Sequence, residues 1–401
     1  MLMFANKSSD QLSLEDLAND FCEQHGIIIS KQALQERFND FSVSFMKDLL
    51  KRQLSQQLPG MRPEFCRHFN RIRVKDSTRF CVPKDYGSIY KGQGGIGTSA
   101  QISIQYEYDL LTGAPIVLEL TSACRNDQQD SRETLNNIEK DDLLIRDLAY
   151  TSQNYIHHIA TTKGYYLNRL NSKWTMYDKH GALIDFSKIV KRLKRHSLSV
   201  VEFDANIAIG KDLLNTRLIV SRVDDKTYNE RLRKAQIAAG SKGYQLSNRF
   251  KTYAALNLFI TNVPKQWLKT EQVRAAYGLR WQIELIFKVW KSQANINKVK
   301  EMKLQRFQCQ LLAKLLWILV NWKMLRIIQD WFAHQDKRYK CSIWKFYKVA
   351  YRLSSLLRQA LCYRTAPSNW LTHLVTKAEK KFLTETKTTK PNVQAVLYLL
   401  A

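Results

Sequence analysis

The spacing of apolar residues changes along the chain and predicts three successive blocks of secondary structure. In the first 70 residues, SLEDLANDFCEQHG and GIIISKQALQERFNDF repeat apolar residues at helical spacing, so two helices are expected there. From about residue 71 to 264, apolar residues are often β-branched or aromatic, or alternate with polar ones, which is typical of strands. Helical spacing returns after Pro264. The chain is therefore predicted to be an α/β protein with helical regions at both ends.

The middle block has a predicted order of elements. RIRVKDSTRFCVP, AQISIQYEYDL and APIVLELTSA predict three consecutive strands separated by turns. A polar helix is expected in DSRETLNNIEKDD, a short buried strand in LLIRDLAY that ends near Asp147, and a helix in SQNYIHHIATTKG. Residues from about 165 to 264 are expected to be mainly β, with one clear helix in DKTYNERLRKAQIAAGS and a last strand in FKTYAALNLFITNVP.

The N-terminal helices allow two interpretations. Gly26 is expected to end the first helix and Ser30 to cap the second. Two short helices joined by a glycine-containing turn are compatible with a helix-turn-helix DNA reader, although this turn is longer than usual. The alternative is an ordinary helical bundle that packs on the rest of the chain.

The segment YGLRWQIELIFKVWKSQ, residues 277–293, carries an unusual polar pattern. It lacks glycine and proline after Gly278, so one long helix is expected, with Leu285 among the residues that point into the core. At about 100° per residue, five residues fall within an arc of roughly 80°. They are Tyr277, Arg280, Glu284, Lys288 and Lys291. Such a narrow stripe indicates charges that need partners, such as metal and phosphate. Ion pairs between Glu284 and the lysines on a solvated face are the alternative.

Charge points to a polyanionic partner. The 401 residues carry a net charge of +27, and residues 261–401 alone contain 26 Lys or Arg against 7 Asp or Glu, a net of +19. Tryptophans are interleaved with these bases, and the combination suits phosphate contact and base stacking. The alternatives are that the charge only aids solubility and that each tryptophan belongs to the core.

Other features exclude several classes of protein. The seven cysteines form no C-x-x-C pair, so neither a disulfide framework nor a zinc finger is expected. The protein is instead expected in a reducing compartment. The most apolar stretch, which starts at Leu311, is interrupted by Lys314, Asn321 and Lys323. It is therefore expected to form a buried helix and not a membrane span.

Two aspartates in the predicted sheet are candidate catalytic residues. Asp76 lies inside the first predicted strand, where Asp is disfavoured, and Asp147 ends the fourth, at a strand end. Phosphoryl transfer on nucleic acid uses two divalent metals, which carboxylates hold well. Asp141 and Asp142 are interpreted as capping or surface residues. Asp204, the main rival candidate, is expected to face solvent or a turn.

These residues match the pattern of a known family. Tyr277, Arg280, Glu284 and Lys291 have the spacing Y-(2)-R-(3)-E-(6)-K, which resembles the signature of transposases of the insertion-sequence-four family. VKDSTRF resembles the first-aspartate segment of that family, and RDLAY resembles the second, with Ala149 where Gly is common. TNVPKQWL ahead of the signature is also typical. The resemblance covers about residues 70 to 300.

The resemblance implies a DDE enzyme and a domain plan. In this plan, residues 71–163 and 265–310 form a ribonuclease-H-like catalytic core, which a β-rich insertion at residues 164–264 interrupts. Residues 1–70 form a helical DNA-binding region, and residues 311–401 form a basic helical C-terminal region. The resemblance further implies that Asp76, Asp147 and Glu284 are catalytic and bind two Mg²⁺ or Mn²⁺. It also implies that Tyr277, Arg280, Lys288 and Lys291 bind DNA.

The implied activity is cleavage and joining of the ends of an insertion sequence, with a hairpin intermediate. The implied partners are double-stranded DNA, as terminal inverted repeats and target, and a second copy of the chain in a synaptic homodimer. Trp267 is a candidate for stacking on a flipped base. No membrane partner is expected, and the implied location is the bacterial cytoplasm, at the nucleoid. The alternatives are a ribonuclease-H-like nuclease and an inactive, transposase-derived DNA-binding protein.

Overall fold

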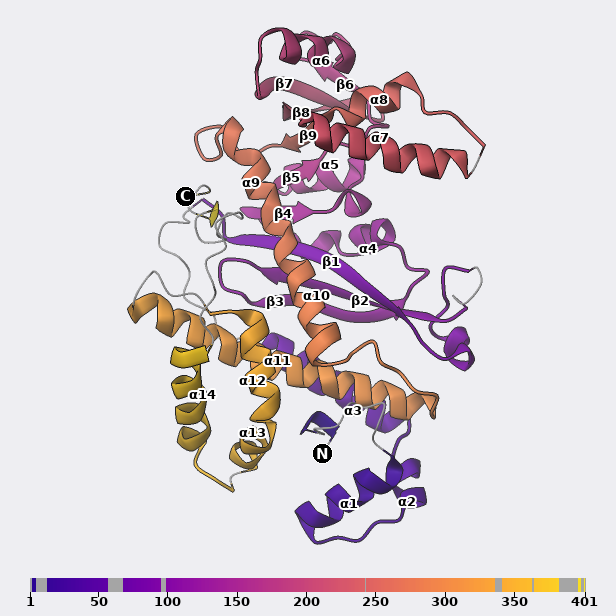
Figure 1. The fold of residues 1–401 in the computed structure, drawn as a ribbon, viewed down its shortest axis with the longest axis vertical. Helices are drawn as coiled ribbons and strands as arrows, with labels where there is room; N and C mark the ends of the chain where they lie inside the picture. The colour runs from indigo at the N-terminus through magenta and orange to yellow at the C-terminus, as the bar shows by residue number, and fades with distance from the viewer. Residues whose placement is uncertain are drawn as a thin grey trace. The chain divides into compact units, whose positions relative to one another are not determined.

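The computed structural model describes most of the chain and divides it into two compact units (Figure 1). The described residues are 2–4, 13–56, 68–94, 99–241, 243–335, 341–362, 364–381, 396–397 and 400. Unit 1 comprises Met1–Arg62, Asp76–Arg125 and Trp281–Thr389, and unit 2 comprises Pro63–Lys75, Asn126–Arg280 and Lys390–Ala401. The chain therefore passes between the units inside its first strand, after Lys75, and again after Arg280.

Unit 2 is built on a mixed sheet. Its strands are β1 (Arg71–Cys81, up to Lys75 in this unit), β4 (Asp142–Arg146), β5 (Tyr165–Arg169), β6 (Met176–Asp178), β7 (Val200–Ile209), β8 (Asp212–Arg222) and β9 (Leu256–Thr261). They are hydrogen-bonded in the order β1-β4-β5-β9-β8-β7-β6. β1, β4 and β5 run parallel, and Lys75 pairs with Arg146. Because Lys75 pairs with Arg146, β4 ends beside the middle of β1, which continues to Cys81.

Helices cover this sheet and bury its core. They are α4 (Asp127–Glu133), α5 (Gln153–Thr161), α6 (Phe186–Arg195), α7 (Asp225–Gly240), α8 (Asn248–Ala254) and α9 (Val273–Tyr277). One hydrophobic cluster joins apolar residues of α5 and α6, such as Ile156 and Leu193, to residues of β4, β5, β7, β8 and β9. Burial of these side chains is the main force that holds the two helices on the sheet.

Unit 1 combines a β-hairpin with long helices. The hairpin strands β2 (Gln101–Asp109) and β3 (Pro115–Ser122) are antiparallel and continue the order β3-β2-β1. The helices are α1 (Leu14–His25), α2 (Lys31–Glu36), α3 (Asp40–Ser55), α10 (Trp281–Gln293), α11 (Leu304–Gln335), α12 (Ile343–Arg352), α13 (Ser354–Leu361) and α14 (Pro367–Lys381). α11 packs against α3, and α10 against α12.

The hairpin turn shows how closely α11 approaches the sheet. Gly113 has φ +70°, and the side chain of Arg326 occupies the space that a Cβ atom would need. The Nε1 atom of Trp322 donates a hydrogen bond to the Gly113 carbonyl at 2.6 Å. Any larger residue at Gly113 would therefore strain the backbone and displace the arginine.

The predicted α/β class is confirmed, and most predicted elements are present. The three strands after residue 70, the strand before Asp147 and the helix from Asp225 all form. Gly26 ends α1 with φ +68°, and Ser30 caps α2. Of the expected terminal regions, residues 1, 5–12, 57–67, 336–340, 363, 382–395, 398–399 and 401 lie outside the described ranges.

Several predicted elements differ from those observed. The block expected to be mainly β contains α6 and α8 as well as α7, and the polar helix expected after β3 is the shorter α4. The helix expected over residues 277–293 is interrupted, because Gly278–Arg280 form a 3-10 turn before α10. A 3-10 turn advances each residue by about 120°, so Tyr277 and Arg280 do not keep the phase of an uninterrupted helix. Leu285 is 47% exposed, so its expected burial is wrong.

Candidate active site

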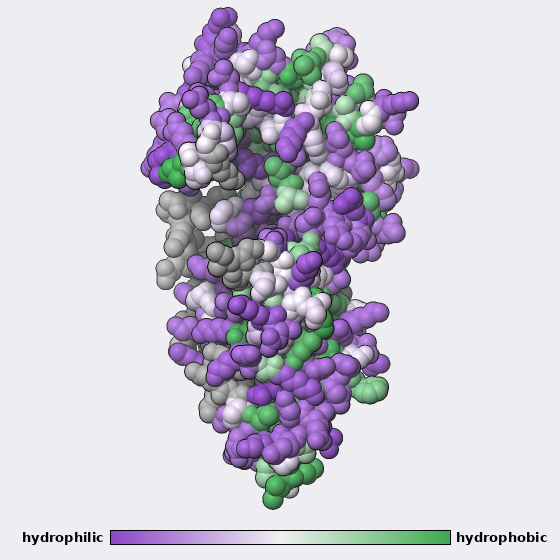
Figure 2. Space-filling model, turned by 90° about the vertical axis from the view of Figure 1, so that its right-hand side faces the viewer, coloured by the Kyte–Doolittle hydropathy of each residue, from purple (hydrophilic) through white to green (hydrophobic). Residues whose placement is uncertain are grey.

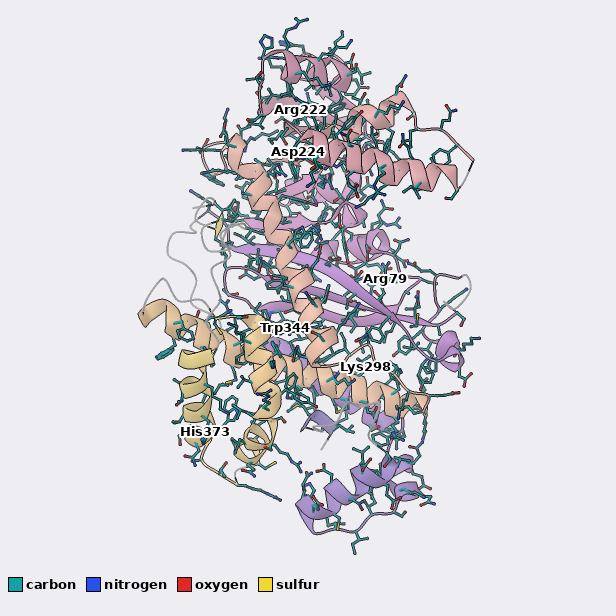
Figure 3. All side chains as sticks on the ribbon, in the orientation of Figure 1. Arg79, Arg222, Asp224, Lys298, Trp344 and His373 are labelled. Atoms are coloured by element: carbon teal, nitrogen blue, oxygen red, sulfur yellow. The ribbon has the colours of Figure 1, made fainter. Side chains whose placement is uncertain are left out.

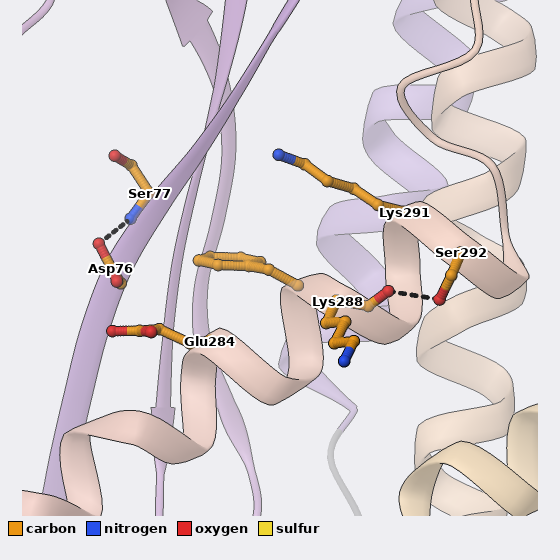
Figure 4. Close-up of a pocket in the computed structure, with 7 residues that line it drawn as sticks. Asp76, Ser77, Glu284, Lys288, Lys291 and Ser292 are labelled. Carbon is orange, nitrogen blue, oxygen red and sulfur yellow. Dashed lines mark hydrogen bonds between the residues drawn. The ribbon is translucent and has the colours of Figure 1, made fainter.

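A pocket in unit 1 brings together four of the predicted site residues (Figure 4). It has a volume of about 510 Å³ and is lined by Asp76, Ser77, Glu284, Phe287, Lys288, Lys291 and Ser292. Glu284 extends from α10 toward Asp76 on β1, and the two lysines follow one and two turns later on the same helix. Two carboxylates and two lysines thus line one pocket, a combination that suits the binding of cations and phosphate.

Both acids are held by regular backbone. The Oδ1 atom of Asp76 accepts a hydrogen bond from the backbone N–H of Ser77 at 2.8 Å, which orients the carboxylate on the strand. Glu284 lies in the first turn of α10, where the helix dipole stabilises negative charge. Because a strand and a helix supply them, these acids stand on rigid elements.

The two lysines have different surroundings. Lys291 is half-buried, which lowers the pKa of its ammonium group, and its Nζ donates a hydrogen bond to the Arg79 carbonyl at 3.3 Å. Lys288 is exposed, and its Nζ lies 5.9 Å from the ring centroid of Trp344. Trp344 belongs to α12 and is labelled in Figure 3. Of the two lysines of the pocket, Lys291 is therefore held by a hydrogen bond, whereas Lys288 is exposed to solvent.

Asp147 lies in unit 2, at the end of β4. Its Oδ1 atom accepts a hydrogen bond from the backbone N–H of Leu148 and caps a short 3-10 helix. The Nη1 atom of Arg280 lies 3.7 Å from Asp147 Oδ2, and the Asp147 side chain is 43% exposed. The Arg280 side chain is 11% exposed, so a mostly buried arginine lies beside an accessible carboxylate.

Tyr277 also lies beside Asp147. Burial, reinforced by the negative charge of Asp147, raises the pKa of the Tyr277 phenol to about 12. The hydroxyl therefore stays protonated near neutral pH, and it donates a hydrogen bond to the Arg146 carbonyl at 3.5 Å. Tyr277 and Arg280 are thus neighbours of Asp147 within unit 2, whereas Glu284, Lys288 and Lys291 line the pocket of unit 1.

The backbone around Asp147 is fixed by two residues that the sequence did not single out. The amide of Asn168 donates hydrogen bonds to the Arg146 carbonyl at 3.2 Å and to Thr151 Oγ1 at 2.9 Å. The Thr151 hydroxyl donates to the Asp147 carbonyl at 3.1 Å. Both Asn168 and Thr151 are buried. They clamp the peptide units on both sides of the Asp147 Cα atom.

The expectation that Asp142 is a capping or surface residue is wrong. Its side chain is fully buried and accepts hydrogen bonds from Arg71 Nε at 2.7 Å and from Arg73 Nη1 at 2.9 Å. The hydrogen bond to Asp142 raises the pKa of Arg71. Two arginines on β1 need a counter-charge on the neighbouring strand, and that pairing is not visible in the local sequence. Asp204, by contrast, is exposed on β7, as expected.

Trp267 is already engaged within unit 2. Its ring stacks on His68 at 4.2 Å between centroids, and Phe69 and Tyr165 approach edge-on. One face of the indole is therefore covered by a histidine. A flipped base would have to stack on the other face or displace His68.

Comparison with known proteins identifies the family. The sequence profile described as "Transposase DDE domain" matches residues 67–320, more than half of the chain. The chain belongs to the DDE transposases. The transposase for insertion sequence element IS231E of Bacillus thuringiensis subsp. finitimus is 30% identical over 407 residues, 96% of this chain and 85% of the relative. The transposase for IS1151 of Clostridium perfringens is 29% identical over 310 residues, 73% of this chain and 66% of the relative.

These matches confirm the predicted resemblance to insertion-sequence-four transposases. They also confirm the prediction that the protein is an enzyme, a DDE transposase. Membership in the family implies a general dependence on divalent metal. Among the described residues, no group of three or more His, Cys, Asp or Glu side chains is arranged to hold a metal ion. The pocket of unit 1 offers two carboxylates, Asp76 and Glu284. Carboxylate oxygens fit a hard cation such as Mg²⁺ or Mn²⁺ and not a thiolate-preferring one.

No helix in the described part of the chain is long and apolar enough to cross a bilayer. α11 is the longest of them, and Lys314, Asn321 and Lys323 interrupt its apolar run.

Proposed function

We propose that this transposase cuts the ends of an insertion sequence and joins them to target DNA by metal-dependent phosphoryl transfer on a ribonuclease-H-like core. The observation that carries the proposal is the pocket of unit 1, where Asp76 and Glu284 share one cavity with Lys288 and Lys291. Membership in the DDE transposases adds the reaction class.

The proposed roles follow from the chemistry of each side chain. Asp76, Asp147 and Glu284 hold two Mg²⁺ or Mn²⁺ ions. When bound, these ions activate the attacking oxygen and stabilise the leaving one. Lys288 and Lys291 neutralise the phosphate of the strand being cut, and they place it against the carboxylates.

Arg280 and Tyr277 are proposed to brace the DNA beside Asp147. The guanidinium is planar and binds phosphate through two parallel hydrogen bonds. The Tyr277 phenol keeps its proton, because its pKa is raised to about 12, and so remains a hydrogen-bond donor. Together they suit a distorted strand, such as the hairpin by which the second strand is cut.

The proposed partners are terminal inverted repeats and target DNA, bound by a homodimer in a synaptic complex. The helical N-terminus contributes to DNA binding, and the basic C-terminal helices contribute to DNA contact and dimerisation. The proposed location is the bacterial cytoplasm, at the nucleoid. A nuclease of the same fold would use the same three acids without synapsis. An inactive derivative is disfavoured because all three acids are retained.

The test uses purified protein, Mg²⁺ and a duplex that carries the inverted repeats flanking the gene. Asp147→Asn is expected to abolish end cleavage and joining while the protein still binds the duplex. Asp204→Asn is the matched control, because Asp204 is an exposed strand carboxylate of the same unit, and it should cleave normally. Cleavage without any joining would favour the nuclease, and full cleavage by Asp147→Asn would refute the proposal.

A further inference from the structure

Helix α6 of unit 2 has two sharply different faces. Its N-terminus is capped by Asp185, which accepts hydrogen bonds from the backbone N–H groups of Ser187 and Lys188. Its apolar residues are buried in the core of unit 2; they are Phe186, Ile189 and Leu193. Its five basic residues are all exposed; they are Lys188, Lys191, Arg192, Lys194 and Arg195. At about 100° per residue, the bases cover an arc of roughly 160° opposite the apolar residues.

The exposed face of α6 has little counter-charge. Among the described residues, none of its five basic side chains forms an ion pair, and the acid nearest in sequence is the N-cap Asp185, which interacts electrostatically with Lys188. Lys188 with Arg192, and Lys191 with Arg195, are like-charge pairs four residues apart, which destabilise a helix. In Figure 2, the surface near α6 at the top of the view is mainly hydrophilic. Arg192, Lys194 and Arg195 lie in the last turn, where the helix dipole favours positive charge, but Lys191 has neither that role nor an ion pair among the described residues.

Helix α7 of the same unit uses its bases differently. Arg233 and Lys234 both pair with Glu230, at 2.9 and 3.3 Å. Arg231 donates hydrogen bonds to the carbonyls of Ala254 and Leu256 and to Asn257. The positive charge of α7 is therefore largely neutralised or engaged in holding the fold, and that of α6 is not.

We propose that the basic face of α6 binds the phosphate backbone of duplex DNA, through residues other than those that line the pocket or surround Asp147. Lys188 and Arg195 are seven residues apart, a rise of about 10 Å, which matches the rise of about three base pairs. Basic side chains on successive turns of α6 can therefore contact successive phosphates of one DNA strand. A membrane partner is disfavoured, because the apolar face of α6 is buried and cannot enter a bilayer. The proposal rests on the proposed function, since it adds a contact to the same DNA substrate.

The test compares two triple variants of the full-length protein. One is Lys191→Gln, Arg192→Gln and Arg195→Gln on α6, and the other is Lys226→Gln, Arg233→Gln and Lys234→Gln on α7. Each removes three exposed charges from one helix of the same unit, and Gln preserves helix propensity. Binding to a random-sequence 30-base-pair duplex is measured at several salt concentrations without divalent metal.

The α6 variant is expected to bind more weakly than the unmodified protein. The slope of log binding constant against log salt should become shallower by about 2 to 3 for three lost phosphate contacts. The α7 variant should keep a slope close to that of the unmodified protein. Equal slopes in the two variants would overturn the proposal, and so would an α6 variant that loses affinity only for vesicles of anionic lipid.

A third variant keeps the charge of α6. It exchanges lysine and arginine at three positions, Lys191→Arg, Arg192→Lys and Arg195→Lys, and it should bind DNA with the salt slope of the unmodified protein. Because no divalent metal is present, the result does not depend on whether the protein cleaves DNA. Loss of cleavage in Asp147→Asn tests the proposed function separately, so failure of one proposal is distinguishable from failure of the other.

Discussion

The acids assigned to catalysis stand in two different environments. In unit 1, Asp76 and Glu284 share a pocket with two lysines, and a strand and a helix hold them. In unit 2, Asp147 follows the last residue of β4, and hydrogen bonds from Asn168 and Thr151 fix the backbone around it. Regular secondary structure positions the first two acids, whereas a buried polar network positions the third. The third acid should therefore depend most on residues that never touch DNA.

The largest expected effect concerns the acids of the pocket. Asp76→Asn and Glu284→Gln should each reduce end cleavage on the order of 10³-fold or more, because each removes a charged ligand of the proposed metals. Binding to the terminal repeat should persist in both, as measured by electrophoretic mobility shift. Glu119→Gln, which changes an exposed acid on β3 of the same unit, is the control and should cleave normally. Undiminished cleavage by Glu284→Gln would remove Glu284 from the proposed set.

An intermediate effect is expected at Asn168. Asn168→Leu removes the bonds to the Arg146 carbonyl and to Thr151, so the backbone of Asp147 is less well held. Turnover at saturating DNA should fall about 10- to 100-fold, and the Mn²⁺ concentration for half-maximal activity should rise. The DNA concentration for half-maximal cleavage should change little.

A matched substitution separates this positioning role from general damage to the sheet. Asn206 lies on β7, and its amide donates a hydrogen bond to the Asp178 carbonyl at 3.4 Å. Asn206→Leu should leave the Mn²⁺ requirement unchanged. If both variants shift the Mn²⁺ requirement equally, the difference drawn between the two environments is lost.

The smallest effect is expected from the ionisation of Tyr277. Its pKa is about 12 in the folded protein against an ordinary value of 10, so the folded state holds the phenolic proton more tightly. The associated stability is fully present below about pH 10 and is lost as the pH rises toward 12. Thermal unfolding should therefore show a smaller loss of stability between pH 10 and 12 for Tyr277→Phe than for the unmodified protein. Parallel pH profiles would contradict the raised pKa.

The local pattern of the sequence predicted a large part of the fold. β1 to β4 and α7 follow from β-branched alternation and helical spacing within a few residues. α6 falls within the block of residues 165–264 that is predicted to be mainly β, although Phe186, Ile189 and Leu193 recur at helical spacing after the capping Asp185. In this segment, the helical spacing of the apolar residues predicts the local structure better than the neighbouring strands do.

The candidate site was predicted in part. The projection of one helix brought Glu284, Lys288 and Lys291 to one side, and they do line one pocket with Asp76. The same projection included Tyr277 and Arg280, but a 3-10 turn separates them from α10, and both lie beside Asp147 in unit 2. Whether Asp76, Asp147 and Glu284 act together stays a prediction.

The sequence by itself determined the α/β class, the family signature and the identity of the candidate acids and bases. These properties depend on local periodicity and on residue spacing along one chain. Only the tertiary structure decided that Asp142 pairs with Arg71 and with the buried Arg73, and that Asn168 and Thr151 hold the backbone of Asp147. It also decided that the basic residues of α6 form no ion pair with a described residue, while most of those of α7 are paired or hydrogen-bonded. Each of these depends on partners that are distant in sequence, because a buried charge or amide is satisfied by whatever the fold brings beside it.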